Sequence, residues 1–202
     1  YGGNNHGGMV CVNEKWYIFY HRHTNGTNFS RQGMIESITI LPDGSIPQVE
    51  MTSLGANEQP FIGQGEYPSH IACNLFCSDE EMYSAPFDAW LNHQFPKITQ
   101  DGGAGDIEMG YIANMRDGAT AGFKYFDFRD LKQITLKTRG YAEGFFEVKT
   151  SWHGEVLGKI SIGYTNVWQE NSAFVSIPNG KHALYLTYRG AGGANLLSFK
   201  LT

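Results

Sequence analysis

Short segments in which apolar and polar residues alternate follow one another along most of this chain. Alternation of this kind is typical of half-buried β-strands, whereas no stretch of roughly ten residues keeps the 3.6-residue period of a helix. Regularly spaced strands with turns between them predict an all-β sandwich or barrel. The segments in the second half are AGFKYFDF (121–128), KQITLKT (132–138), GFFEVKTSW (144–152), VLGKISIGY (156–164), SAFVSI (172–177), HALYLTY (182–188) and NLLSFKL (195–201).

Two similar stretches lie near the beginning of the chain, at residues 9–23 and 31–46. In the first, Asn13 and Glu14 separate two apolar runs. In the second, the sequence Pro-Asp-Gly-Ser at residues 42–45 is a strong turn signal. These features predict antiparallel hairpins.

Between these two regions the alternation weakens, and residues 51–69 are rich in Gly, Pro and polar side chains. Such composition is expected where one folded unit passes to another. We therefore expect a first unit at residues 1–57, a linker at 58–68 and a second unit at 69–202.

Composition narrows the range of partners. The chain has 202 residues, 25 glycines, 14% aromatic residues and a net charge of -5, which suits a turn-rich all-β protein. Its 15 Lys and Arg residues are scattered, so we expect no nucleic-acid partner. It lacks the apolar run of roughly 20 residues of a membrane helix, so we expect no membrane partner. Because it begins at Tyr1 without Met or a signal peptide, we expect a truncated N-terminus.

The motif YGGNNHGGM, followed by KWYIFYHRHTNGTNFSRQGMIESI, resembles the last part of the five-bladed β-propeller of family 43 glycoside hydrolases. That family includes β-xylosidases, arabinofuranosidases and arabinanases. The resemblance covers about residues 1–50 and implies a partial β-propeller whose catalytic portion lies upstream. It also implies that His6 lies near the propeller axis, where a hydrated calcium ion is often found, and that Arg31 faces the substrate.

The residue types agree with those roles. A His in a Gly/Asn-rich loop can expose a ring nitrogen to a cavity, and a guanidinium offers several hydrogen bonds to sugar hydroxyls. The simpler alternative is a turn His and a surface Arg. A metal cluster at residues 21–23 is not expected, because alternation sends His21 and His23 to one face and Arg22 to the other.

No pair of catalytic carboxylates is recognisable in the chain. Glycoside hydrolysis needs at least two placed Asp or Glu residues, and in family 43 these come from earlier blades. We expect the acidic residues here to be solvated, so we assign no catalytic residue and predict that the chain alone is inactive. These acidic residues are Glu14, Glu36, Asp43, Glu50 and the run at 79–81.

A second resemblance covers roughly residues 69–202 and is to family 6 carbohydrate-binding modules. It depends on MGYIANMRDGATAGFKYFDF, GKISIGYTNVWQENSAFVSIPNGKHALYLTYRG and GGANLLSFKL, in that order. The resemblance implies a jelly-roll-like β-sandwich that holds a sugar between two aromatic rings, Tyr111 and Trp168, above the Asn195 amide.

The chemistry of these residues suits a sugar. A flat ring contacts the apolar CH face of a sugar, and an amide can donate to one hydroxyl and accept from another. Trp168 lies in a turn-like stretch, although a partly buried core Trp is the alternative. Asn195 follows a Gly-rich segment and could be an ordinary loop residue, and the alignment at Tyr111 can slip by a few positions.

One departure from the family pattern concerns a structural calcium ion. HIACNLF stands where family 6 modules usually have a Glu-rich first strand, and Leu197 lies near the position of a usual Asp. Both changes argue against that calcium site in the sandwich.

Three functions remain open. In the first, the chain binds xylan- or arabinan-type plant cell-wall oligo- or polysaccharide, as the C-terminal part of an extracellular glycoside hydrolase. In the second, it completes the active site of a β-xylosidase or α-L-arabinofuranosidase whose carboxylates lie upstream. In the third, the sandwich braces the propeller without binding sugar.

Overall fold

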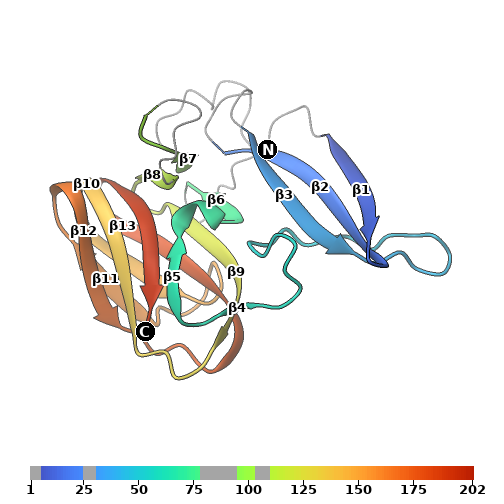
Figure 1. The fold of residues 1–202 in the computed structure, drawn as a ribbon. Helices are drawn as coiled ribbons and strands as arrows, with labels where there is room; N and C mark the ends of the chain where they lie inside the picture. Colours follow the sequence, from blue (N-terminus) through green and yellow to red (C-terminus); the bar gives the residue numbers. More distant parts are fainter. Residues whose placement is uncertain (1–5, 25–30, 78–94, 103–109) are drawn as a thin grey trace.

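The protein is all-β in its computed structural model, which describes residues 6–24, 31–77, 95–102 and 110–202. A three-stranded sheet and a ten-stranded sheet lie beside each other (Figure 1). Apart from a single 3-10 turn, Ser69–Ile71, the described residues form no helix, and so none that could cross a membrane. The strong alternation of the sequence accounts for this architecture.

The first sheet has the order β1-β2-β3 and consists of antiparallel hairpins, as predicted. Its strands are β1 (Gly7–Val12), β2 (Lys15–His23) and β3 (Arg31–Ile38). Asn13 and Glu14 have φ values of 50° and 64°, the positive values that a tight two-residue hairpin turn requires. The outer strand β1 is exposed along its whole length, so this sheet keeps an uncovered edge in the described structure.

The second sheet forms the curled sandwich. Its strand order is β11-β10-β13-β8-β7, with β12 paired to β10, β9 and β5 paired to β13, and β4 and β6 paired to β9. The strands are β4 (Phe61–Ile62), β5 (Gly65–Pro68), β6 (Asn74–Phe76), β7 (Lys97–Thr99), β8 (Tyr111–Met115), β9 (Thr120–Phe128), β10 (Gln133–Lys149), β11 (Gly158–Ile162), β12 (Thr165–Phe174) and β13 (Gly180–Leu201).

Two long strands, β10 and β13, run antiparallel through the whole sandwich. The sequence predicted two shorter strands in place of each. They stay continuous because glycines let the backbones meet closely where the sheet bends: a Cβ on Gly144 would lie 2.1 Å from the Arg189 carbonyl oxygen. Gly190 and Gly192 have φ values of 146° and 76°, so the Gly-rich segment is a bend within β13 and not a loop.

The core lies between the two layers of the curled sheet. Its largest fully buried side chains are Tyr188, Phe123, Phe126, Phe128, Phe146, Phe199, Ile112, Met115, Ile134, Leu136, Ile160 and Leu184. Aromatic rings meet edge to face across it, as for Phe126 and Phe199 at 5.9 Å. Side chains on alternate positions of β9, β10 and β13 supply most of this core.

Residues 58–68, expected to be a linker, contribute two strands to the ten-stranded sheet. β4 pairs with β9, and β5 pairs with β13. Phe61 and Tyr67 pack against the core, with ring centroids 5.4 Å apart. The Gly and Pro residues that suggested a linker allow short edge strands, and burial of the two aromatic rings holds them on the sandwich.

The two sheets are joined by buried hydrogen bonds. Arg22, 2% exposed on β2, donates to the carbonyl oxygens of Ala72 and Cys73 in the sandwich. Gln32 on β3 donates to the His70 carbonyl oxygen at 2.8 Å. Two neighbouring strands of the first sheet are therefore fastened to one segment of the second.

Candidate functional site

Tyr111 and Trp168, the two rings predicted to hold a sugar, lie together at one end of the sandwich. Their ring centroids are 5.3 Å apart, and the rings meet nearly edge to face at 71°. Tyr111 begins β8, whereas Trp168 lies on β12 across the sheet. Trp168 is therefore in a strand and not in the turn expected from its neighbours, and its ring is half-buried.

Arg139 lies beside both rings and contacts each of them. Its guanidinium carbon is 4.2 Å from the Trp168 centroid and 5.2 Å from the Tyr111 centroid. A cation over an aromatic face is attracted by the ring quadrupole. The guanidinium therefore stabilises the positions of both rings and places N–H donors beside them.

Asp101 fixes the position of this guanidinium. Both carboxylate oxygens accept hydrogen bonds from Arg139 Nη2, at 2.7 and 2.8 Å, and Asp101 Oδ1 also accepts from the Tyr111 hydroxyl at 3.1 Å. The hydrogen bond to Arg139 lowers the pKa of Asp101, so this carboxyl is ionised at neutral pH. Burial raises the pKa of the Tyr111 hydroxyl, which stays protonated.

Asn195 lies beside this cluster on β13, directly opposite Arg139. Its Oδ1 atom accepts a hydrogen bond from the Asn114 backbone N–H at 3.4 Å. Within the described part of the chain its amino group, Nδ2, has no hydrogen-bond partner. Asn195 can therefore donate to a ligand hydroxyl, while its acceptor is used by the protein.

The structure thus brings together the three residues predicted for sugar binding and adds two that the sequence did not indicate, Arg139 and Asp101. The two rings contact each other and Tyr111 is 8% exposed, so a sugar cannot lie between them as the resemblance implied, and the accessible ring is that of Trp168. Arg139 occupies an outward position of an alternating strand, where a surface charge is ordinary. Asp101 lies outside any motif. Only the pairing of β10 with β12 and β13 shows that Arg139 faces Trp168 and Asn195.

His6 and Arg31 lie at one end of the three-stranded sheet. The His6 ring is 6.0 Å from the ring of His21, which stacks on His23 at 5.9 Å, so the alternation expected for the two histidines is observed. Arg31 is opposite His23, and burial together with the Arg31 charge lowers the pKa of His23. His6 and Arg31 are both exposed.

The described residues at this end of the sheet do not form a calcium site of their own. Calcium takes oxygen ligands, whereas the described ring beside His6 is the imidazole of His21. Among the described residues no three His, Cys, Asp or Glu side chains converge as metal ligands. A calcium ion held through water at His6 therefore stays a prediction for the intact protein, and so does the argument against a calcium site in the sandwich.

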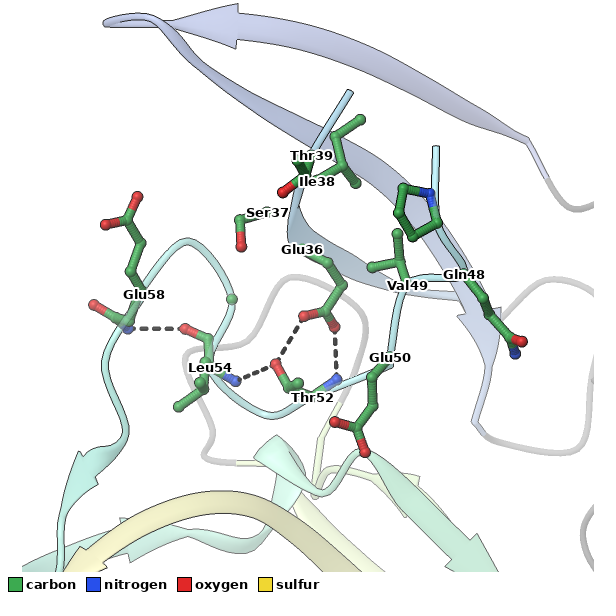
Figure 2. Close-up of a pocket in the computed structure, with 13 residues that line it drawn as sticks. Glu36, Ser37, Ile38, Thr39, Gln48, Val49, Glu50, Thr52, Leu54 and Glu58 are labelled. Atoms are coloured by element: carbon green, nitrogen blue, oxygen red, sulfur yellow. Dashed lines mark hydrogen bonds between the residues drawn. The ribbon is translucent and has the colours of Figure 1, made fainter. Parts of the chain in front are cut away.

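Glu36 was expected to be solvated, but this prediction is wrong. The residue is 5% exposed on β3, and its carboxylate accepts hydrogen bonds from the Thr52 backbone N–H and hydroxyl, both at 2.7 Å (Figure 2). Burial raises its pKa. No sequence pattern indicates this burial, because Thr52 lies in the irregular segment that folds back over β3.

A cavity of about 290 Å³ lies beside Glu36, between the end of β3 and residues 47–58 (Figure 2). Glu50 and Glu58 also line it, but Lys124 and Lys15 respectively pair with these carboxylates at 2.9 and 2.7 Å. Glu36, Glu50 and Glu58 thus fasten the irregular segment to its surroundings. The cavity is structural and offers no acid and base pair for hydrolysis.

Known proteins resemble this chain over its whole length. No family model matches it. The chain is 65% identical over 201 residues to a xylosidase/arabinosidase from Thermoclostridium stercorarium, and the match covers 100% of the chain and 42% of that protein. The chain spans less than half the length of the curated relatives it matches.

Solved structures show the same fold. A glycoside hydrolase family 43 arabinoxylan arabinofuranohydrolase from Bacillus subtilis matches 100% of this chain over 41% of its own, with 19% identity and a TM-score of 0.60. A CBM6 module from Clostridium stercorarium matches 72% of this chain over 98% of its own, with 18% identity and a TM-score of 0.56. The chain is therefore similar to the C-terminal part of a xylosidase/arabinosidase, and the expected likeness to a family 43 glycoside hydrolase followed by a family 6-like carbohydrate-binding module is confirmed.

Proposed function

We propose that this chain binds plant cell-wall polysaccharide of the xylan or arabinan type through the cluster of Tyr111, Trp168, Arg139 and Asn195. The chain would hold a glycoside hydrolase on its substrate. Its partners are this polysaccharide and the catalytic propeller portion of the same protein, in an extracellular setting.

The observation that carries the proposal is the convergence of the cluster. Tyr111, Trp168 and Asn195 come from three strands that are far apart in sequence, yet both rings contact the Arg139 guanidinium and Asn195 lies opposite Arg139 on the neighbouring strand. Trp168 is half-buried and supplies an apolar face, Tyr111 is 8% exposed and packs against it, and Arg139 and Asn195 supply N–H donors. This is the combination that a sugar needs, with apolar CH faces and hydroxyl edges.

Titration calorimetry with xylo-, arabino- and cello-oligosaccharides tests this proposal directly. Trp168→Ala removes the largest ring face and should weaken binding by about one to two decades, taking base–aromatic stacking of roughly 1–3 kcal/mol as a guide. Phe174→Ala is the matched control, because Phe174 is 80% exposed at the far end of the same strand. Equal binding by the wild type and a normally folded Trp168→Ala variant would refute the proposal.

A second function, bracing of the propeller, has its own support. The hydrogen bonds of Arg22 and Gln32 join the first sheet to the sandwich. The Thr24 carbonyl oxygen also accepts from the Ile98 N–H at 2.7 Å, which links the end of β2 to β7. Because β7 pairs with β8, the three-stranded sheet is connected through β7 to the strand that carries Tyr111.

The enzyme alternative, in which residues 1–57 complete an active site, depends on His6 and Arg31. Both are exposed at one end of the first sheet. Their roles require the upstream blades. Expression of the whole hydrolase with His6→Ala or Arg31→Ala, followed by xylosidase and arabinosidase assays, would test them, since loss of turnover without loss of folding is expected.

A further inference from the structure

A second pair of aromatic rings lies in the open at the same end of the sandwich. Tyr141 is 78% exposed and Tyr164 is 58% exposed, and their ring centroids are 4.6 Å apart with an interplanar angle of 45°. Neither ring belongs to the buried core. Ala142, the next residue on β10 after Tyr141, is the one that points into the core.

The pair is next to the Trp168 cluster. Tyr141 lies two positions after Arg139 on β10, and Tyr164 lies four positions before Trp168, just outside β12. Thr138 and Ala142 are buried, so alternation turns Arg139 and Tyr141 outward. Two positions along a strand span roughly 6–7 Å, so the backbones of Arg139 and Tyr141 are separated by about that distance on the same face of β10.

The backbone beneath Tyr141 is packed tightly. A Cβ on Gly192, at a φ of 76°, would lie 1.7 Å from the Tyr141 carbonyl oxygen, so β13 runs against β10 at this point. Only glycine permits this approach. The backbone that carries Tyr141 is thus held in place, and ordering a tyrosine ring on ligand binding costs little conformational entropy because only two χ angles are fixed.

We propose that Tyr141 and Tyr164 form a second stacking position for a neutral β-linked sugar chain, adjacent to the Trp168 cluster, so that the protein holds several consecutive units of one chain. The inference rests on the proposed function. Each tyrosine offers an apolar face for the CH groups of a sugar and a hydroxyl for its edge. A site open on this side suits the interior of a polysaccharide as well as its end.

Calorimetric titration of the full chain with xylose, xylobiose, xylotetraose and xylohexaose tests the inference. For the wild type, affinity should rise with chain length. The double variant Tyr141→Ala/Tyr164→Ala should bind the short sugars as the wild type does but lose about tenfold in affinity for the long ones. Phe174→Ala should match the wild type for all lengths, and the surface changes should leave the melting temperature nearly unaltered.

The outcomes separate the two proposals. If the double variant keeps the full rise in affinity with length while Trp168→Ala weakens binding, the second stacking position is refuted and the proposed function stands. If the wild type binds no sugar, or Trp168→Ala changes nothing, both fail. If the wild type self-associates in analytical ultracentrifugation and the double variant does not, the rings form a contact between copies, and the inference is overturned.

Discussion

The guanidinium carbon of Arg139 lies 4.2 Å from the centroid of the Trp168 ring, while both oxygens of Asp101 hold the same guanidinium from the other side. Trp168 thus contacts a charged group, and it is not one of the side chains of the buried core. Arg139 covers one face of the ring, so a sugar must either use the remaining ring surface or displace the guanidinium. This arrangement makes Arg139 the first residue to test after Trp168.

Arg139→Ala should weaken binding of neutral oligosaccharides. Of the guanidinium nitrogens, Nη2 is the one that donates to Asp101, so the N–H groups of Nε and Nη1 can donate to a sugar hydroxyl. Loss of one such hydrogen bond costs about 0.5–1.5 kcal/mol. Affinity should fall by several-fold to tenfold in calorimetry. Arg129→Ala is the control, since that side chain is 81% exposed and pairs only with Asp127 among the ion pairs of the described chain. A gain in affinity for Arg139→Ala would show that the guanidinium blocks the ring.

The substitution Asn195→Asp distinguishes the donor role of the Asn195 amide from its acceptor role. The carboxylate can still accept from the Asn114 N–H, but it has no donor for a ligand. We expect binding to fall by about 0.5–1.5 kcal/mol, with little change in the melting temperature. Asn195→Ala should lose the same affinity and also some stability, because the Asn114 N–H then lacks its acceptor. If Asn195→Asp binds like the wild type, the amino group does not contact the ligand.

Local patterns in the sequence were enough to predict the hairpins of the first sheet, much of β9, β10, β11 and β13, and three members of the ring cluster, but not the geometry of that cluster. Trp168 and Tyr111 were recognisable from the motifs around them. Arg139 was not, because its position depends on the pairing of β10 with two strands that are distant in sequence. The bends at Gly144 and Gly190 were read as breaks between strands for the same reason: whether a glycine ends a strand or bends it depends on which backbone lies against it.

The same limit applies to polar residues. Glu36 was assigned to a solvated surface because acidic side chains usually lie there. Its burial depends on Thr52, in an irregular segment whose path over β3 no periodicity reveals. Residues 61–68 were also misjudged from composition, since Phe61 and Tyr67 outweigh the neighbouring Gly and Pro residues once the core is formed.

Glu36 should make stability depend on pH. Burial raises its pKa in the folded state, so the folded protein binds this proton more tightly than the unfolded chain does. This contribution to stability is fully present below the unfolded Glu pKa of about 4.3 and is lost as the pH rises through the raised folded value. Glu36→Gln cannot titrate. The free energy of unfolding of the wild type minus that of Glu36→Gln should therefore decrease from acid toward neutral pH in urea titrations, and an increase would contradict the assignment.

The chain alone should not hydrolyse aryl xylosides or arabinosides. Among the described residues the buried carboxylate of Glu36 is held by Thr52, and the two other acids that line its cavity, Glu50 and Glu58, are paired with Lys124 and Lys15. Chromogenic assays on chain made in a host without such enzymes should show only the rate of the buffer blank. Turnover that persists through purification and disappears in Glu36→Gln would overturn this prediction.

Arg22→Ala should loosen the first sheet from the sandwich. The Arg22 guanidinium is buried and donates to the Ala72 and Cys73 carbonyl oxygens, and hydrogen bonds to a charged group contribute about 1.5–3 kcal/mol each at most. We expect the free energy of unfolding to fall by a few kcal/mol, and amide exchange to speed up in β2, β3 and β6 while the pairing of β10 with β13 stays protected. Arg22→Lys should recover part of the loss, because an ammonium can still donate to one carbonyl. Equal acceleration throughout the sandwich would mean that Arg22 supports the whole fold, and no acceleration in β6 would mean that Arg22 does not couple the two sheets.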